Sequence, residues 1–348
     1  METNEMTKTT IVTTTIRVPT FLAAYADNIR QNECADVDFI VVGDMKSVVG
    51  TREFCQTIPN CEYLGIADQE DYLQQFPKLL AHIPYGSVSR RNIGILKAYE
   101  QGADVVITLD DDNLLADPDP IKAHGIVGTT VDIPRVEAST GWYNVCDHLT
   151  EESNVEFYHR GFPGKHRWEY TEICNRVMLS PVVVNAGLWL GNPDVDAVTR
   201  LERPLNTISG GGCFSLAPGT WSPFNCQNTA LARKVIPAYF MSPRIGRHDD
   251  IFASYVVTRL AEHFGDVISF GAPLSNHQRS PHDLWKDLDA ERWGMHGTDQ
   301  FCDLLRGIKL NAATYHDGFG QIINELKKHV WIGEGLCGQV SKCCMRAW

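Results

Sequence analysis

The chain has 348 residues, 43% of them hydrophobic, and a formal net charge of −12 at pH 7. This length and apolar content suit one large domain or two modest ones with a real core. The acidic balance argues against a nucleic-acid partner, because phosphate backbones are bound by an excess of Lys and Arg, yet it allows a local nucleotide site.

The first hundred residues predict alternating strands and helices. β-branched runs predict strands, and apolar residues at helical spacing predict helices. The first expected strand starts at Thr9 and ends near Arg17 and Pro19, and two more cover 37–44 and 104–109. The expected helices cover 21–32 and 87–103. This alternation predicts an α/β fold with a mostly parallel central sheet flanked by helices.

The rest of the chain continues with strands and a clear helix. Strands are expected over 181–191 and 266–277, a helix over 249–265, and mostly helical structure over 298–330. We therefore expect one main domain over 8–300, which would hold any site at the strand ends, and a C-terminal helical extension over 301–348 that packs on it.

The polar start and the lack of a long apolar run give no sign of a signal peptide or a membrane span. The 11 cysteines have no repeated spacing, which indicates reduced thiols in a cytoplasmic protein. Cys337, Cys343 and Cys344 lack a CxxC pair or a His partner, so we expect a reduced tail and not a metal site.

Three consecutive carboxylates, Asp110, Asp111 and Asp112, follow the apolar strand 104–109. A solvated turn is the plain alternative. Carboxylates at the end of a buried strand suit a divalent cation better, since Mg²⁺ and Mn²⁺ prefer hard oxygen ligands and often bridge carboxylates to substrate phosphates. Alternation along an extended chain assigns Asp110 and Asp112 to the ligand side and Asp111 to the other face.

Other polar residues fall at or near the same sheet edge. Arg17 and Asp44 fall at the ends of the first two predicted strands, and ligands of such sheets sit beyond the carboxyl ends of the strands. Arg91 and Asn92 open the helix before the acidic strand, so they can reach the same crevice. Arginine suits a phosphate or a nucleobase carbonyl, although arginine pairs are also common on surface helices.

The segment 157–170 is locally basic in an acidic protein. Its cations include Arg160, Lys165 and Arg167, which suit either a solvated loop or a clamp that stabilises a leaving diphosphate. Asp249 and Asp250 either cap the helix that follows or supply a base or a contact to a sugar hydroxyl. His277 ends a strand and is either structural or a late ligand to the metal of the aspartate run.

Several strings occur in a fixed order between about Thr13 and His277: TTTIR, RNIG, ITLDDDN, RGFPGKHR, NAGLWLGNPDVDA and IGRHDD. Together they resemble the reversibly glycosylated polypeptides, also called UDP-arabinopyranose mutases. The resemblance implies the glycosyltransferase A-type (nucleotide-diphospho-sugar transferase) fold, UDP-sugar binding and dependence on Mn²⁺ or Mg²⁺. It also implies pyranose–furanose interconversion of a UDP-sugar, with reversible glycosylation of an arginine that corresponds to Arg160.

The resemblance, added to the residues, suggests a mechanism. A metal held by Asp112, with Asp110 and His277, would neutralise the diphosphate, and Arg91 and Asn92 would hold the uridine or its ribose. Arg160 would lie near the anomeric carbon. A guanidinium stays protonated near neutral pH, so as a nucleophile it would need a carboxylate such as Asp249 or Asp250 to take its proton. Otherwise it would stabilise the separating charges.

Three alternatives stay open. One is a glycosyltransferase that moves the sugar to a small-molecule amine or guanidine acceptor. Another is a self-glycosylated scaffold or sugar-nucleotide-binding subunit. The third, a nucleotidyltransferase, lacks its Gly-rich, lysine-containing N-terminal signature. A homo-oligomer is also possible in each case.

Overall fold

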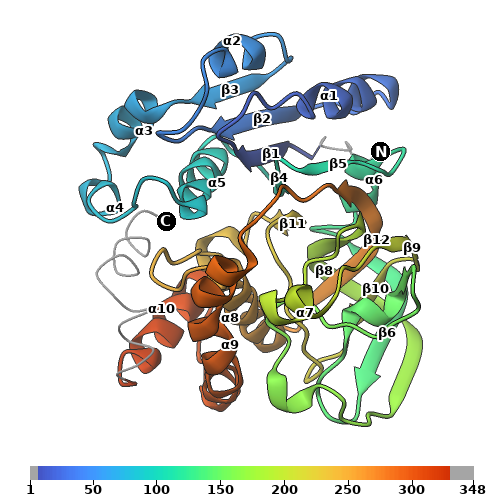
Figure 1. Cartoon of the computed structure of the whole chain (residues 1–348). Coiled ribbons are helices and arrows are strands. Elements are labelled where there is room, and N and C mark those ends of the chain that lie inside the picture. The colour runs from blue at the N-terminus through green and yellow to red at the C-terminus, as the bar shows by residue number, and fades with distance from the viewer. Residues whose placement is uncertain (1–6, 330–348) are drawn as a thin grey trace, which may run out of the picture.

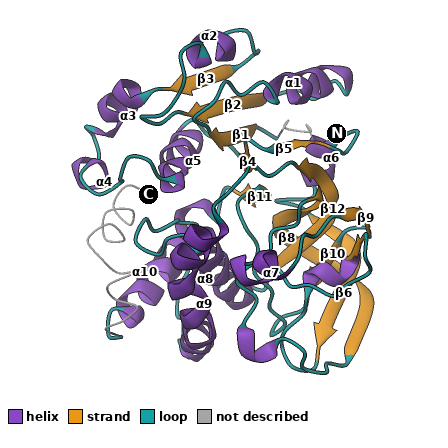
Figure 2. Ribbon diagram, viewed as in Figure 1, coloured by secondary structure: helices purple, strands orange, loops and turns teal. Residues whose placement is uncertain are grey.

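The computed structural model describes residues 7–329 as one twelve-stranded sheet with helices packed around it (Figures 1 and 2). The strands are β1 (Thr9–Thr14), β2 (Val37–Val42), β3 (Cys61–Leu64), β4 (Val105–Asp110), β5 (Asn113–Leu115), β6 (Thr130–Ala138), β7 (Leu149–Glu151), β8 (Ile173–Gly191), β9 (Thr207–Gly210), β10 (Phe214–Leu216), β11 (Asn228–Ala232) and β12 (Val267–His277). The α-helices are α1 (Leu22–Gln31), α2 (Thr51–Cys55), α3 (Ile66–Leu73), α4 (Pro77–Leu80), α5 (Arg91–Glu100), α6 (Pro120–His124), α7 (Ala197–Glu202), α8 (Asp249–Phe264), α9 (Leu284–Gly307) and α10 (Tyr315–Leu326).

The N-terminal part forms the predicted parallel sheet, with strand order β3-β2-β1-β4 (Figure 1). Thr14 at the end of β1 is level with both Val42 and Asp110, so three strands end at one edge. β1 ends at Thr14, earlier than predicted, and Arg17 therefore lies in the loop after the strand. The α/β class expected from the sequence is confirmed.

Helix α5 lies unusually close to this sheet because of Gly94. A Cβ atom at that position would come within 2.6 Å of Val12 Cγ1 and 2.8 Å of Val42 Cγ2. A larger side chain would therefore push the helix away from β1 and β2. The close contact sets Arg91, three residues earlier on the helix, near the strand ends.

Beyond β4 the sheet is mixed, and the prediction of a mostly parallel sheet holds only for the N-terminal part. β11 runs antiparallel to both β4 and β8, and β8 runs antiparallel to β6. β8 begins at Ile173, eight residues before the predicted start, because 173–181 pairs with β6 along its length. β6 was not predicted from the sequence.

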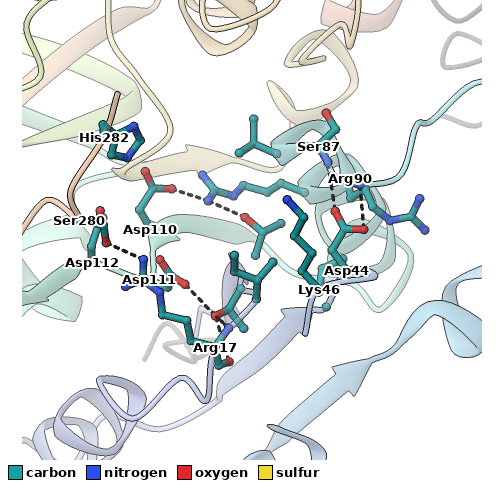
Figure 3. A pocket seen from close by; sticks show the side chains of 18 residues that line it. Arg17, Asp44, Lys46, Ser87, Arg90, Asp110, Asp111, Asp112, Ser280 and His282 are labelled. Atoms are coloured by element: carbon teal, nitrogen blue, oxygen red, sulfur yellow. Dashed lines mark hydrogen bonds and ion pairs between the residues drawn. The ribbon is translucent and has the colours of Figure 1, made fainter. Parts of the chain in front are cut away.

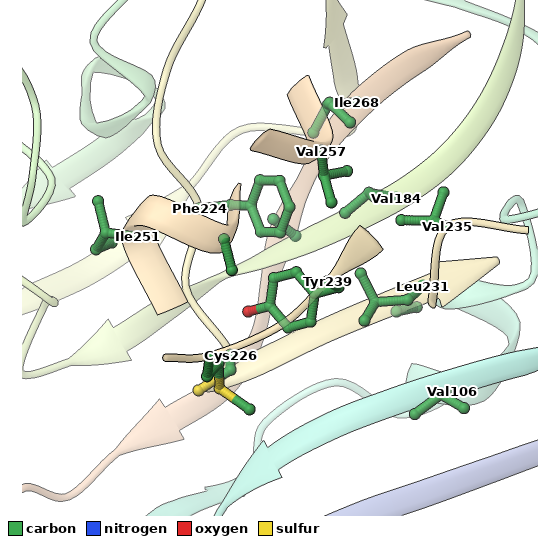
Figure 4. Close-up of a cluster of buried hydrophobic side chains, with 14 of the residues drawn as sticks. Val106, Val184, Phe224, Cys226, Leu231, Val235, Tyr239, Ile251, Val257 and Ile268 are labelled. Carbon is green, nitrogen blue, oxygen red and sulfur yellow. The ribbon is translucent and has the colours of Figure 1, made fainter. Parts of the chain in front are cut away.

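The core continues between the sheet and α8, whose residues are mostly buried. Figure 4 shows Phe224, Tyr239 and Val257 packed among strand residues such as Val184 and Leu231. The helix predicted over 249–265 is therefore confirmed as α8.

The C-terminal part adds α9 and α10 beside α8 (Figure 1). The predicted boundary at 300/301 falls within α9, and the division into two domains stays a prediction. Cys337, Cys343 and Cys344 lie outside the described residues. Among residues 7–329, no helix is both long and apolar enough to cross a membrane.

Candidate functional site

A pocket of about 330 Å³ opens at the carboxyl ends of β1, β2 and β4 (Figure 3). Its lining includes Arg17 after β1, Asp44 after β2, and the aspartate run that ends β4. These residues lie together, as expected, because parallel strands end at the same edge of a sheet. The remaining lining residues with charged or hydroxyl side chains are Thr14, Thr15, Lys46, Ser87, Arg90, Arg91, Ser280 and His282.

The three aspartates have three different partners. Asp110 forms an ion pair with Arg91, and Asp111 accepts a hydrogen bond from Thr15 Oγ1 at 2.7 Å. Asp112 faces His277, with 3.4 Å between Asp112 Oδ2 and His277 Nε2. All three line the pocket, but Asp111 is engaged by the loop after β1 and Asp112 by the end of β12.

Pairing of β5 with β12 brings His277 to the aspartates across 165 residues of sequence. His277 is level with Asn113, and Gln278 N donates to the carbonyl of Asp112 at 2.8 Å. His277 Nδ1 lies 2.6 Å from the carbonyl oxygen of Asn192. A carbonyl only accepts, so Nδ1 donates to it, and Nε2 is the ring nitrogen that faces Asp112.

This pair suits part of a divalent-cation site. Burial raises the pKa of Asp112, but the contact with His277 outweighs burial and holds that pKa below its ordinary value, so Asp112 is ionised at neutral pH. A histidine whose other nitrogen donates to a carbonyl is the usual arrangement of a metal ligand. Within residues 7–329, no three His, Cys, Asp or Glu side chains gather closely enough to hold a metal alone. A cation here would need further oxygen ligands, which substrate phosphates commonly supply.

Asp44 organises the opposite wall of the pocket. Its carboxylate accepts hydrogen bonds from the backbone N–H groups of Gly86 and Ser87 at 2.9 and 3.0 Å. It also accepts from Met45 N at 2.7 Å. Asp44 thus ties the loop after β2 to the segment that leads into α5, and fixes the position of Ser87 at the pocket wall.

Arg91 forms the floor of the pocket and is 2% exposed. Besides Asp110, it donates to Thr14 Oγ1 at 3.0 Å and to the carbonyl oxygen of Cys226 at 2.9 Å. The buried guanidinium joins β1, β4 and the segment before β11, so it holds the strand ends together at the pocket that it lines.

Three of the predicted substrate-binding residues do not line this pocket. Asn92 is buried and donates to the carbonyls of Ser89 and Met241, both at 2.8 Å. Lys165 pairs with Asp303 at the surface, 2.7 Å away, and Arg167 pairs with Asp196. Each of these three side chains is therefore bonded to a partner outside the pocket.

The predicted catalytic residues form a second, buried cluster. Arg160 donates to Asp194 through Nε and Nη2, at 2.9 Å each, and to Asp250 through Nη1 and Nη2, at 3.0 Å each. Nη1 also donates to the carbonyl oxygen of Arg247. Gly161 permits this approach to α8, because a Cβ atom there would lie 2.3 Å from Ile251 Cγ2. We call Arg160, Asp194, Asp249 and Asp250 the arginine cluster.

The arginine cluster contains one carboxyl with a strongly shifted pKa. Burial, reinforced by the charge of Asp250, raises the pKa of Asp249 to about 7. Burial also raises the pKa of Asp250, but Arg160 outweighs it and holds that pKa below its ordinary value. Burial lowers the pKa of Arg160, and Asp194 and Asp250 together hold it well above the ordinary arginine value. Arg160 is therefore a cation, and Asp249 is the group that can exchange a proton near neutral pH.

Sequence reasoning missed several residues that the structure brings to these sites. Lys46, Arg90, Ser280 and His282 line the pocket, and Ser280 accepts from Arg17 Nη2 at 2.5 Å. Asp194, which lies in the string NAGLWLGNPDVDA, holds Arg160. The signal for Asp194 was a carboxylate just after a buried strand, the same signal that identified Asp110–Asp112.

The chain resembles curated plant UDP-arabinopyranose mutases over about a third of their length, as its motifs suggested. It is 32% identical over 108 residues to the probable UDP-arabinopyranose mutase 1 of Pisum sativum. This aligned region covers 29% of this chain and 30% of that protein. It is 29% identical over 135 residues to UDP-arabinopyranose mutase 1 of Arabidopsis thaliana, covering 36% of this chain and 38% of that protein. No family model matches the chain.

Solved structures with a similar arrangement include glucosyl-3-phosphoglycerate synthase from Mycobacterium tuberculosis. Its complex with phosphoglyceric acid is 11% identical, with a TM-score of 0.48, and covers 85% of this chain and 80% of that chain. The complex of the same enzyme with Mn²⁺ and UDP-glucose is 10% identical, with a TM-score of 0.45, and covers 85% of this chain and 79% of that chain. Likeness at this level carries no functional argument.

Proposed function

We propose that the protein is a metal-dependent UDP-sugar enzyme of the mutase type, which interconverts the pyranose and furanose forms of a UDP-sugar. One observation carries the proposal: a pocket at the ends of three parallel strands combines an aspartate run, a facing histidine and basic side chains. The partial similarity to UDP-arabinopyranose mutases supports the same substrate class. We also propose the A-type nucleotide-diphospho-sugar fold, which the parallel strands β3-β2-β1-β4 support.

In this proposal the pocket holds the nucleotide part of the substrate. Asp112 and His277 would bind Mn²⁺ or Mg²⁺ together with the diphosphate, and the bound cation would make UDP a better leaving group. Arg17 and Lys46 are exposed pocket-lining cations that form no salt bridge within residues 7–329, so they suit the phosphates. Asp110 is already paired with Arg91, and a role as a third metal ligand would require it to share its carboxylate.

The arginine cluster would act on the sugar. Arg160 is a cation held from two sides, which suits stabilisation of the departing diphosphate more than nucleophilic attack. As a nucleophile it would first have to give its proton to one of the carboxylates that now bind it. Asp249, with a pKa near 7, suits proton transfer with a sugar hydroxyl, so that the ring can close through a different oxygen.

The proposed setting is the cytoplasm. The eight described cysteines are all free, including four that are buried, and Cys55 on α2 and Cys61 on β3 lie near each other without a disulfide. Free thiols of this number suit a reducing compartment.

Product analysis tests the proposed activity. The purified chain is incubated with Mn²⁺ and UDP-arabinopyranose, and with UDP-glucose for comparison, and the nucleotide sugars are separated by chromatography while the intact protein mass is recorded. Exchange between the pyranose and furanose forms is the expected result. A gain of one pentose in mass that disappears in Arg160→Ala would support covalent glycosylation of that residue.

Other outcomes would change the proposal. Exchange that continues without any mass gain would assign Arg160 a purely electrostatic role. Release of UDP without exchange, with sugar appearing on an added amine or guanidine, would favour the transferase alternative. Binding of UDP with no turnover of either sugar would favour the binding-subunit alternative.

A further inference from the structure

Three consecutive residues connect the nucleotide pocket to the arginine cluster. Asn225, Cys226 and Gln227 immediately precede β11, and Figure 4 shows Cys226 beside the buried cluster around Tyr239. On the pocket side, the carbonyl oxygen of Gln227 accepts from Asp110 N at 3.0 Å. The carbonyl oxygen of Cys226 accepts from Arg91 Nη1 at 2.9 Å. The segment is thus bonded to two residues of the pocket.

The same segment is bonded to both carboxylates that hold Arg160. Cys226 N donates to Asp250 Oδ2 at 3.3 Å, and Asn225 Nδ2 donates to Asp194 Oδ2 at 2.7 Å. A continuous series of hydrogen bonds therefore runs from Asp110 to Arg160. The position of Arg160 relative to the pocket depends on this segment.

Asn225 is the only member of the segment whose side chain reaches the arginine cluster through a hydrogen bond that the structure describes. The side chain is buried, and its Oδ1 accepts from Gln227 N at 3.1 Å while its Nδ2 also lies 3.1 Å from Gln227 Oε1. An amide supplies a donor and an acceptor at once. A carboxylate in its place would face Asp194 as a like charge, and an aliphatic side chain would remove a donor from a buried anion.

We propose that Asn225 is a positioning residue for the sugar step: by holding Asp194 it fixes Arg160 relative to the nucleotide pocket. Nucleotide binding does not require it, since the pocket wall lacks Asn225. The inference rests on the proposed function and adds to it a residue that separates binding from turnover.

The test compares Asn225→Asp and Asn225→Leu with the control Thr229→Val. Thr229 Oγ1 donates to the backbone carbonyl of Asn225 at 2.7 Å, so the control removes a hydrogen bond from the same segment without touching Asp194. Affinity for UDP with Mn²⁺ and turnover of UDP-arabinopyranose are measured at about pH 5.5 and about pH 8. Both Asn225 variants should bind UDP within about twofold of wild type and lose at least about tenfold in turnover at the higher pH.

The pH dependence separates positioning from general damage. The charged and titratable groups around Asp194 are Arg160, His159, His248 and Asp250, with Arg200, Arg279, Glu291 and Cys146 also acting on it. Arg160 keeps Asp194 ionised, so at low pH the carboxyl introduced by Asn225→Asp takes the proton and can donate to Asp194 as the amide did. The deficit of Asn225→Asp should therefore shrink at the lower pH, and that of Asn225→Leu should not.

Equal turnover in all variants of an active enzyme would overturn the inference. A double-mutant cycle of Asn225→Leu with Arg160→Gln, read from urea unfolding midpoints, gives a second answer that does not need activity. Coupled effects are expected, whereas additive effects would also overturn the inference. Failure of wild type to bind UDP would reject the proposed function, and the cycle would still decide the role of Asn225.

Discussion

Replacing Asp249 with Asn should change how stability depends on pH. Asp249 is 5% exposed, and its carboxyl has a pKa near 7 in the folded protein against an ordinary value of 3.8. Between about pH 4 and about pH 7, this carboxyl therefore keeps its proton in the folded state but has lost it in the unfolded state. Across this window the group lowers stability by up to about 1.4 kcal/mol for each pH unit, and the loss is complete above the folded pKa.

Asn keeps the shape of the side chain and the acceptor for Asp250 N, which now donates to Asp249 Oδ1 at 2.9 Å, but it carries no charge. Relative to wild type, Asp249→Asn should gain about 3 kcal/mol in unfolding free energy between about pH 5 and about pH 8. Urea unfolding followed by tryptophan fluorescence measures both curves. A difference between the two proteins that stays constant across this range would refute the assignment of a raised pKa to Asp249.

Three further substitutions test how the site is built. Gly94→Ala should destabilise the protein by about 1–2 kcal/mol in urea unfolding, because a new methyl group overlaps Val12 and Val42; unchanged stability would mean that α5 can move away freely. Arg17→Ala should weaken UDP binding by about tenfold in calorimetry through loss of a phosphate donor, and full affinity would exclude Arg17 from the site. Lys165→Ala should leave UDP affinity within about twofold of wild type, because the Lys165 ammonium group pairs with Asp303 outside the pocket. A large loss of affinity would mean that the segment 157–170 contributes to the nucleotide site.

The part of the site that the sequence predicted best depends on one rule of parallel sheets. Arg17, Asp44 and the aspartate run were each recognised at the end of a predicted strand, and parallel strands end at the same edge. The prediction needed only local patterns and their order along the chain. Alternation assigned Asp111 to the face away from the ligand, yet all three aspartates line the pocket, because the chain turns directly after β4.

The residues that the sequence placed wrongly in the pocket have partners that are distant along the chain. Lys165 and Arg167 appeared to be free cations, but their carboxylate partners, Asp303 and Asp196, come from α9 and from the residue before α7. Asn92 follows Arg91 directly, yet it turns away from the pocket toward Met241. None of these pairings leaves a local signal in sequence spacing.

The mixed half of the sheet was also beyond local reasoning. β6 and the first part of β8 form a long antiparallel pair. The first part of β8 is mostly exposed and β6 mixes exposed, half-buried and buried positions, so neither segment has the pattern of a fully buried strand. The pairing of β5 with β12, which carries His277 to Asp112, joins a three-residue strand to one far along the chain. Such short pairings are set by tertiary contacts and not by local propensity.

Calorimetric titration of the full chain with UDP tests the central claim most directly. Wild type should bind UDP in the presence of Mn²⁺, and chelation of the metal with EDTA or the substitution Asp112→Asn should each weaken binding by at least about tenfold. Asp303→Asn, at the surface and away from the pocket, serves as the matched control and should bind as wild type does. UDP affinity that is equal with Mn²⁺ and with EDTA, or unchanged in Asp112→Asn, would contradict a metal-dependent nucleotide-sugar site at the end of β4.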